Sequence, residues 1–90
     1  MSMSRTAITG MGFHVPDKIV TNADLEIMMN TKDEWIRSRS GIEKRHWVQN
    51  GEGGSDLSLV ASKKAMKQAG ITNQDIDMVI VGTASSDYYF

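Results

Sequence analysis

The sequence predicts an α/β fold of which only a part is present. Segments with strand character lie near both ends of the chain, and the stretch between them contains three helical patterns. The last strand candidate, residues 77–83, contains the run Met-Val-Ile-Val without polar alternation, as in a sheet covered on both faces. The order strand, two short helices, strand, long helix, buried strand predicts a right-handed crossover between parallel strands. The last three residues, Tyr88, Tyr89 and Phe90, are all aromatic and come soon after the final strand, whereas C-termini are usually polar. We therefore expect the fold to be incomplete in this chain.

Composition limits the protein to one small globular domain. Its 90 residues are 40% hydrophobic and 23% charged, which excludes a disordered or collagen-like chain. No cysteine is present, which excludes a disulfide scaffold, a thiolate metal site and a cysteine nucleophile within these residues. No apolar run is long enough to span a membrane, and no signal peptide is visible. We therefore expect a cytoplasmic location.

The first expected strand begins near Arg5 and continues to about Val15. Gly10 and Gly12 would bend it or let another backbone approach closely, and Pro16 would end it because proline lacks the N–H that a sheet requires.

Two short helices and a strand are expected next. Thr21 or Asn22 would cap a helix that ends near Met29, and residues 31–34 have the Thr-x-x-Glu spacing of a capping box for a second helix. Gly41 suits the left-handed position that ends such a helix, and residues 42–48 are expected to be extended.

The longest helix is expected over residues 56–69, after a glycine-rich loop at 50–54. Ser55 would cap it and Gly70 would end it. Its apolar stripe has a small-residue edge suited to close packing against a sheet, while three lysines face outward. The small residues are Ala61, Ala65 and Ala69, and the lysines are Lys63, Lys64 and Lys67.

Two familiar kinds of site are excluded by spacing. The Gly10-x-Gly12 pair is followed by Val15 and Pro16 instead of a helix, so it lacks the helix N-terminus that a dinucleotide site needs. His14 and His46 have no carboxylate or cysteine partners at metal-ligand spacing, so no metal site is expected.

Charge is uneven along the chain although the net charge is only −1, which argues against nucleic-acid binding. Residues 35–67 carry seven basic and three acidic side chains. This segment could bind a phosphate group or an acidic partner. The alternative is an ordinary solvent-exposed surface that is basic.

Trp35 and Arg39 are separated by four residues and share one helical face. An indole with a guanidinium beside it can stack on a flat heterocycle while the cation reaches a phosphate. The alternative is a half-buried packing tryptophan beside a surface arginine, and spacing alone does not exclude it. Arg37 lies off this face.

The runs Thr-Lys-Asp-Glu-Trp-Ile at 31–36 and Arg-Ser-Gly-Ile at 39–42, with Arg45 and His46, resemble the N-terminal part of β-ketoacyl-acyl-carrier-protein synthase III. The similarity continues through Ala69-Gly70-Ile71 and Asp75-Ile76-Asp77 to Thr83, and so covers nearly the whole chain.

The resemblance implies a thiolase-like fold of five α-β-α-β-α layers, built from two similar halves and usually homodimeric. Residues 1–90 would be the N-terminal part of the first half, with the remainder absent. The family joins acetyl-CoA to malonyl-acyl-carrier protein to initiate fatty-acid synthesis, using a Cys, a His and an Asn that lie beyond the family's first ninety positions; this chain has no Cys, and neither His14 nor His46 matches the catalytic motif. We therefore expect these 90 residues to contain no catalytic residue and to have no activity alone. The resemblance also implies that no cofactor is permanently bound and that the substrate of the complete enzyme is a coenzyme A thioester.

Binding residues are the part of the family's site that can be matched here. Trp35 corresponds to the residue that stacks on the coenzyme A adenine, Arg39 to one that contacts the nucleotide, and Thr31 to one that hydrogen-bonds near the base. Phe90 corresponds to a position lining the partner subunit's acyl pocket. The alternatives are a related synthase, making polyketide or alkylquinolone starters or hydroxymethylglutaryl-CoA, and a non-catalytic module that binds coenzyme A or a partner protein.

Overall fold

The computed structural model describes residues 4–85, which form two compact units. One unit comprises residues 15–52, and the other joins the N-terminal segment up to residue 14 with the segment that starts at residue 53. The predicted acyl-pocket residue, Phe90, lies outside the described residues.

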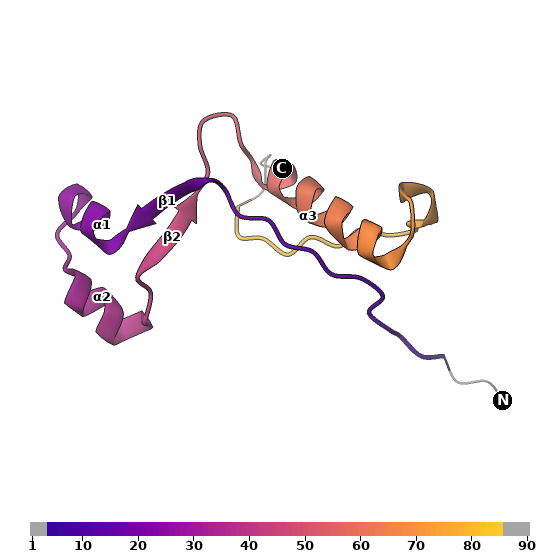
Figure 1. The fold of residues 1–90 in the computed structure, drawn as a ribbon, viewed down its shortest axis with the longest axis horizontal. Coiled ribbons are helices and arrows are strands. Elements are labelled where there is room, and N and C mark those ends of the chain that lie inside the picture. Colours follow the sequence, from indigo (N-terminus) through magenta and orange to yellow (C-terminus); the bar gives the residue numbers. More distant parts are fainter. Residues whose placement is uncertain (1–3, 86–90) are drawn as a thin grey trace. The chain divides into compact units, whose positions relative to one another are not determined.

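The unit of residues 15–52 is built on a two-stranded ribbon (Figure 1). Strand β1 (Lys18–Thr21) pairs antiparallel with β2 (Lys44–Trp47), with Ile19 opposite His46. Helices α1 (Asn22–Met28) and α2 (Asp33–Ser40) connect the two strands at one end of the ribbon (Figure 1). Val20 is the buried apolar centre, with 1% of its surface exposed.

The antiparallel ribbon was not predicted, because residues 18–21 were not expected to form a strand. The α1–α2 connection returns the chain to the end of β1 that it left, as an antiparallel pair requires. The backbone N–H of Asn22 donates to the Glu43 carbonyl at 3.1 Å and closes this end of the unit.

Helix ends follow the predicted chemistry in some places and depart from it in others. Thr21 caps α1 through a reciprocal capping box with Asp24, and Gly41 ends α2 in the left-handed region at φ 74°. The Thr31–Glu34 capping box was wrong: α2 begins later, with Lys32 as N-cap and no side-chain cap bond. The Asp33 N–H is instead satisfied by Glu26 Oε1 at 2.7 Å, an acceptor supplied by α1.

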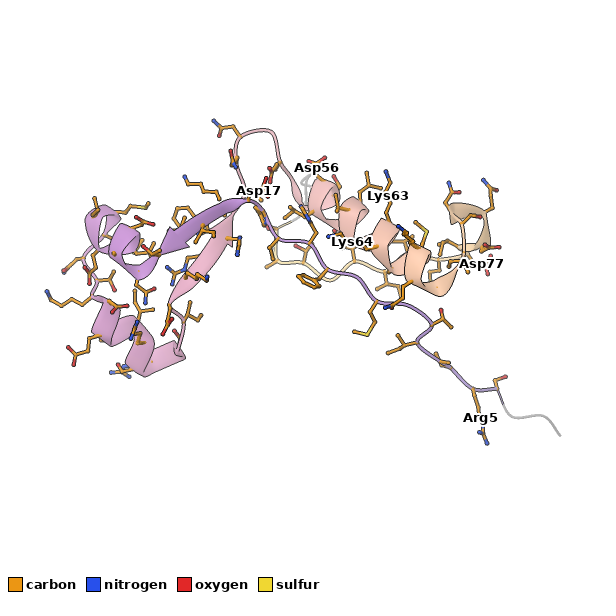
Figure 2. The ribbon with its side chains drawn as sticks, viewed as in Figure 1. Arg5, Asp17, Asp56, Lys63, Lys64 and Asp77 are labelled. Carbon is orange, nitrogen blue, oxygen red and sulfur yellow. The ribbon has the colours of Figure 1, made fainter. Side chains whose placement is uncertain are left out.

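Helix α3 (Gly54–Ala69) dominates the other unit and matches the predicted long helix. Gly70 ends it at φ 71°, as expected. Its N-cap is Gly53, not Ser55, because the Asp56 carboxylate accepts the Gly53 N–H at 2.7 Å and starts the helix earlier. Figure 2 shows Lys63 and Lys64 extending from this helix.

The N-terminal segment lies against the small-residue edge of α3, where the alanine spacing predicted packing against a sheet, but this segment is not a strand. A Cβ placed on Gly12 would lie 2.5 Å from the Ala61 carbonyl oxygen and 2.7 Å from the Ala65 nitrogen. Met11 N–H donates to Gln68 Oε1 at 2.7 Å, and Lys64 Nζ donates to the Phe13 carbonyl at 3.3 Å.

Neither of the two expected outer strands is formed within residues 4–85. Residues 5–16 contain no strand. The first strand, β1, starts only after Pro16, the residue that was predicted to end the expected strand at residues 5–15. Residues 77–83 are also without strand pairing, and Ile8 and Ile80 are 82% and 86% exposed. A strand is defined by backbone hydrogen bonds to a neighbouring strand, and among the described residues neither segment pairs with one.

Candidate functional site

The predicted pair on α2 is assembled in the structure. The Arg39 guanidinium carbon lies 5.6 Å from the centroid of the Trp35 ring, within the range of a cation–π contact. Trp35 is 58% exposed among the described residues, so its ring is accessible there. We call this exposed pair, Trp35 and Arg39, the α2 ledge.

A cavity of about 490 Å³ opens beside the α2 ledge. This size is within the range of small-molecule sites in proteins. Its lining combines the indole face with hydroxyl, amide and charged groups, so a flat polar heterocycle could stack and also find hydrogen-bond partners. The lining residues are Asn30, Thr31, Lys32, Glu34, Trp35 and Ser38.

Thr31 lines this cavity and is not the N-cap residue of α2. Sequence spacing assigned the Thr31 hydroxyl to the N-terminus of α2, where it would compete with any ligand. The structure places Lys32 at the cap and supplies Glu26 as the acceptor of the Asp33 N–H. The Thr31 backbone N–H donates to the Met29 carbonyl at 3.0 Å and holds the residue in place.

Arg37 is directed away from the α2 ledge, as its helical position predicted. Its Nε lies 3.2 Å from Asp33 Oδ1 and its NH2 atom 3.4 Å from Glu43 Oε1. Both ion pairs are well exposed and contribute little to stability, about 0–1 kcal/mol each. Of the two arginines of α2, Arg39 is the one placed beside the indole.

Asn22 does not line the cavity but supports α2, and the sequence indicated it only as a possible helix cap. It is 2% exposed, and its amide makes three hydrogen bonds at once. Nδ2 donates to Asp33 Oδ1 at 2.7 Å and to the Ile42 carbonyl at 2.8 Å, and Oδ1 accepts from the Arg45 guanidinium at 2.7 Å. These partners are 11, 20 and 23 residues away in sequence, so no local pattern signals them.

The described residues contain neither a candidate metal site nor a membrane-spanning helix. Residues 4–85 bring no three His, Asp or Glu side chains together in a way that could hold a metal ion. His46 Nδ1 is paired with the Pro16 carbonyl at 2.6 Å, a structural contact within the ribbon unit. In the same described range, no helix is long and apolar enough to cross a membrane.

Comparison with curated proteins identifies the relatives of this sequence. The chain is 46% identical over 86 residues to β-ketoacyl-[acyl-carrier-protein] synthase III of Dinoroseobacter shibae, and 47% identical over 83 residues to the synthase III of Xanthomonas campestris. These matches cover 96% and 92% of the chain but only 26% of each relative. The chain thus spans about a quarter of the length of these proteins. No protein-family model matches it.

Solved structures agree with the sequence comparison. The 3-oxoacyl-[acyl-carrier-protein] synthase III of Aquifex aeolicus matches 71% of the chain with a TM-score of 0.67 and 36% identity. A priming β-ketosynthase of the R1128 polyketide pathway matches 78% with a TM-score of 0.74 and 28% identity. Each match covers about a fifth of the solved chain, 20% and 21%. The expected fold class, an incomplete part of a thiolase-like α/β fold, is confirmed, as is the resemblance to synthase III.

Proposed function

We propose that this chain, which is similar along nearly its whole length to β-ketoacyl-acyl-carrier-protein synthase III, is the N-terminal, coenzyme-A-contacting part of such a condensing enzyme. The parent enzyme would transfer an acetyl group from acetyl-CoA and condense it with malonyl-acyl-carrier protein in the cytoplasm. Residues 1–90 would form part of the first half of a homodimeric thiolase-like protein. Phe90 would line the acyl pocket of the partner subunit.

The α2 ledge is the observation that carries this proposal. An exposed indole, a guanidinium 5.6 Å from its ring and a cavity of about 490 Å³ beside them suit a purine nucleotide with phosphates. In our proposal Trp35 stacks on the adenine, Arg39 approaches a phosphate and Thr31 hydrogen-bonds near the base.

The chemistry of the condensation is assigned to residues beyond this chain. Thioester exchange needs a nucleophile such as a cysteine thiolate, and these 90 residues contain no cysteine. The chain would supply binding energy for coenzyme A, while the acyl group is accepted elsewhere in the parent enzyme.

Substitutions in the complete enzyme that carries this sequence test the site. Trp35→Ala removes a stacking surface, worth about 1–3 kcal/mol for a base on an aromatic ring. Arg39→Ala removes a charge-assisted contact of about 1.5–3 kcal/mol. Each variant is expected to raise KM for acetyl-CoA roughly tenfold with little change in kcat, because these contacts are remote from the thioester.

Trp47→Ala is the matched control, since Trp47 is also a partly exposed indole with a cation near its ring, Lys18 at 6.0 Å, but belongs to β2. We expect its KM to stay near that of the wild type. An unchanged KM in Arg39→Ala and Trp35→Ala, with a lowered melting temperature in Trp35→Ala, would favour the packing interpretation and contradict the coenzyme site.

A related synthase with another product is the second candidate. The structural match to a polyketide priming ketosynthase, at a TM-score of 0.74, supports it. Both candidates use the α2 ledge in the same way, so the product of the complete enzyme distinguishes them. Isolating the gene and finding no cysteine-containing continuation would instead favour a non-catalytic module that binds coenzyme A.

A further inference from the structure

The position of α2 depends on polar groups that lie outside the α2 ledge. Four side chains of the ribbon unit connect α1 and β2 to the start of α2: Asn22, Glu26, Asp33 and Arg45. We call them the α1–α2 clasp. Within this unit α2 has no buried residue and Val20 is the buried apolar side chain of the strands, so the contacts that connect α2 to the ribbon are mainly polar.

Two clasp contacts hold the first residue of α2 from α1. Glu26 Oε1 accepts the Asp33 backbone N–H at 2.7 Å, and Asn22 Nδ2 donates to Asp33 Oδ1 at 2.7 Å. Asp33 is therefore held through both its backbone and its side chain. Trp35 follows two residues later and Arg39 one further turn along, so their placement depends on where Asp33 is held.

Asn22 is in turn held from the ribbon. Its Oδ1 accepts from Arg45 at 2.7 Å, and the same guanidinium donates to the Val20 carbonyl at 3.2 Å. Its Nδ2 also reaches the Ile42 carbonyl, immediately after Gly41, which ends α2. A single buried amide thus connects both ends of α2 to the two strands.

We propose that Asn22 and Glu26 are positioning residues for coenzyme A binding, which set α2 so that Trp35 and Arg39 can receive the nucleotide together. This inference rests on the proposed function of the α2 ledge. Neither residue lines the ledge cavity, so their effect would pass through Asp33 and not through the ligand.

The expected rise in KM follows from how often α2 occupies the position that can bind the nucleotide. When only a fraction of molecules holds α2 in the competent position, the apparent dissociation constant rises by the inverse of that fraction. Loss of one capping contact would lower the equilibrium constant for the competent position about fivefold, so KM for acetyl-CoA would rise by up to about fivefold with kcat unchanged.

Glu26→Ala and Glu26→Gln in the complete enzyme form the first test. Glu26 is exposed, so its removal should leave the enzyme folded. We expect Glu26→Ala to raise KM about two- to fivefold and to speed amide exchange at Asp33. Glutamine keeps an acceptor oxygen, so Glu26→Gln should restore most of both values. A purely structural role of Glu26 would change the melting temperature and leave KM unaltered, and that result would overturn the proposal.

Asn22→Ala is the stronger perturbation, with Asn50→Ala as its matched control at an exposed turn. We expect a rise in KM of tenfold or more for Asn22→Ala, or loss of folding, and no change for Asn50→Ala. Should Asn22→Ala fail to fold, the Glu26 pair alone decides the proposal. If Trp35→Ala raises KM but Glu26→Ala does not, the clasp is overturned while the coenzyme site stands. If Trp35→Ala leaves KM unchanged, the proposed function fails and the positioning role fails with it.

Discussion

Replacing Gly12 by alanine tests the close approach of the N-terminal segment to α3. A Cβ at this position would lie 2.5 Å from the Ala61 carbonyl oxygen and 2.7 Å from the Ala65 nitrogen. An ordinary van der Waals separation begins at 3.4 Å, so the segment and the helix would have to separate by about 0.9 Å. The obstructing atoms are helix backbone, and no change of side-chain rotamer can relieve the clash.

The energetic cost follows from this displacement. Overpacking typically costs about 1–3 kcal/mol, and a shift of this size would also stretch the hydrogen bond from Met11 N–H to Gln68 and that from Lys64 to Phe13. We expect a loss of about 2 kcal/mol in the free energy of unfolding. In the complete enzyme, about four times as long as this chain, a loss of this size lowers the melting temperature by a few degrees.

Urea unfolding followed by circular dichroism measures this loss, with Gly82→Ala as control. Among the described residues, no atom lies within 4 Å of a Cβ built at Gly82, so alanine there should be neutral or slightly stabilising. Gly10→Ala, where the Ala69 Cβ would be 2.9 Å away, should resemble Gly12→Ala. If Gly12→Ala unfolds at the same urea concentration as Gly82→Ala, the segment does not lie against α3 and the reasoning is refuted.

Further predictions concern the helix caps and the isolated chain. Hydrogen bonds from the backbone and side chain of Thr21 lower the pKa of Asp24 from 3.8, so the stability that Asp24 contributes is present above pH 3.8 and lost as pH falls through the lower folded-state pKa. Acid titration of the melting temperature should therefore show a shallower loss below pH 3.8 in Asp24→Asn than in the wild type. Thr31→Val should leave the melting temperature of the complete enzyme unchanged but raise KM for acetyl-CoA; a lowered melting temperature alone would restore the hydroxyl to a capping role. The 90-residue chain, incubated with labelled acetyl-CoA and malonyl-acyl-carrier protein, should form no product, and turnover above the blank would contradict the absence of a nucleophile. Light scattering of the same chain should show oligomers or aggregates, because apolar side chains such as Ile80 are exposed; a stable 10.0 kDa monomer would contradict this.

Local signals in the sequence predicted the helices well. Glycines at 41 and 70 adopt the left-handed conformation that ends a helix, and the Thr21–Asp24 spacing forms a true capping box. These features depend on contacts within a few residues. The wrong caps, at Thr31 and Ser55, failed because another acceptor was better placed: Glu26 from a different helix in the first case, and Asp56 reaching back to Gly53 in the second.

The outer strands could not be decided by local pattern. The apolar run at residues 78–81 and the segment around Ile8 have the composition of strands, but a strand forms only when a neighbour satisfies its backbone groups. Conversely, β1 was missed because Pro16 appeared to end a strand, whereas its short sequence pairs with β2 just beyond that proline. Pairing across more than twenty residues is a tertiary property, and composition does not encode it.

The proposed site has two kinds of residue: those proposed to contact the ligand and those proposed to position them. Trp35 and Arg39 were predictable because helical geometry brings residues four apart onto one face, whatever the rest of the chain does. Asn22 was visible only as a possible helix cap, since its partners come from 11 to 23 residues away. Asn22 is 2% exposed, whereas Trp35 is 58% exposed. A ligand could contact the exposed indole but not the buried amide, which hydrogen-bonds to the first residue of the helix that carries the indole. Substitutions at the buried amide should therefore affect binding as strongly as substitutions at the indole itself, although no ligand would touch it.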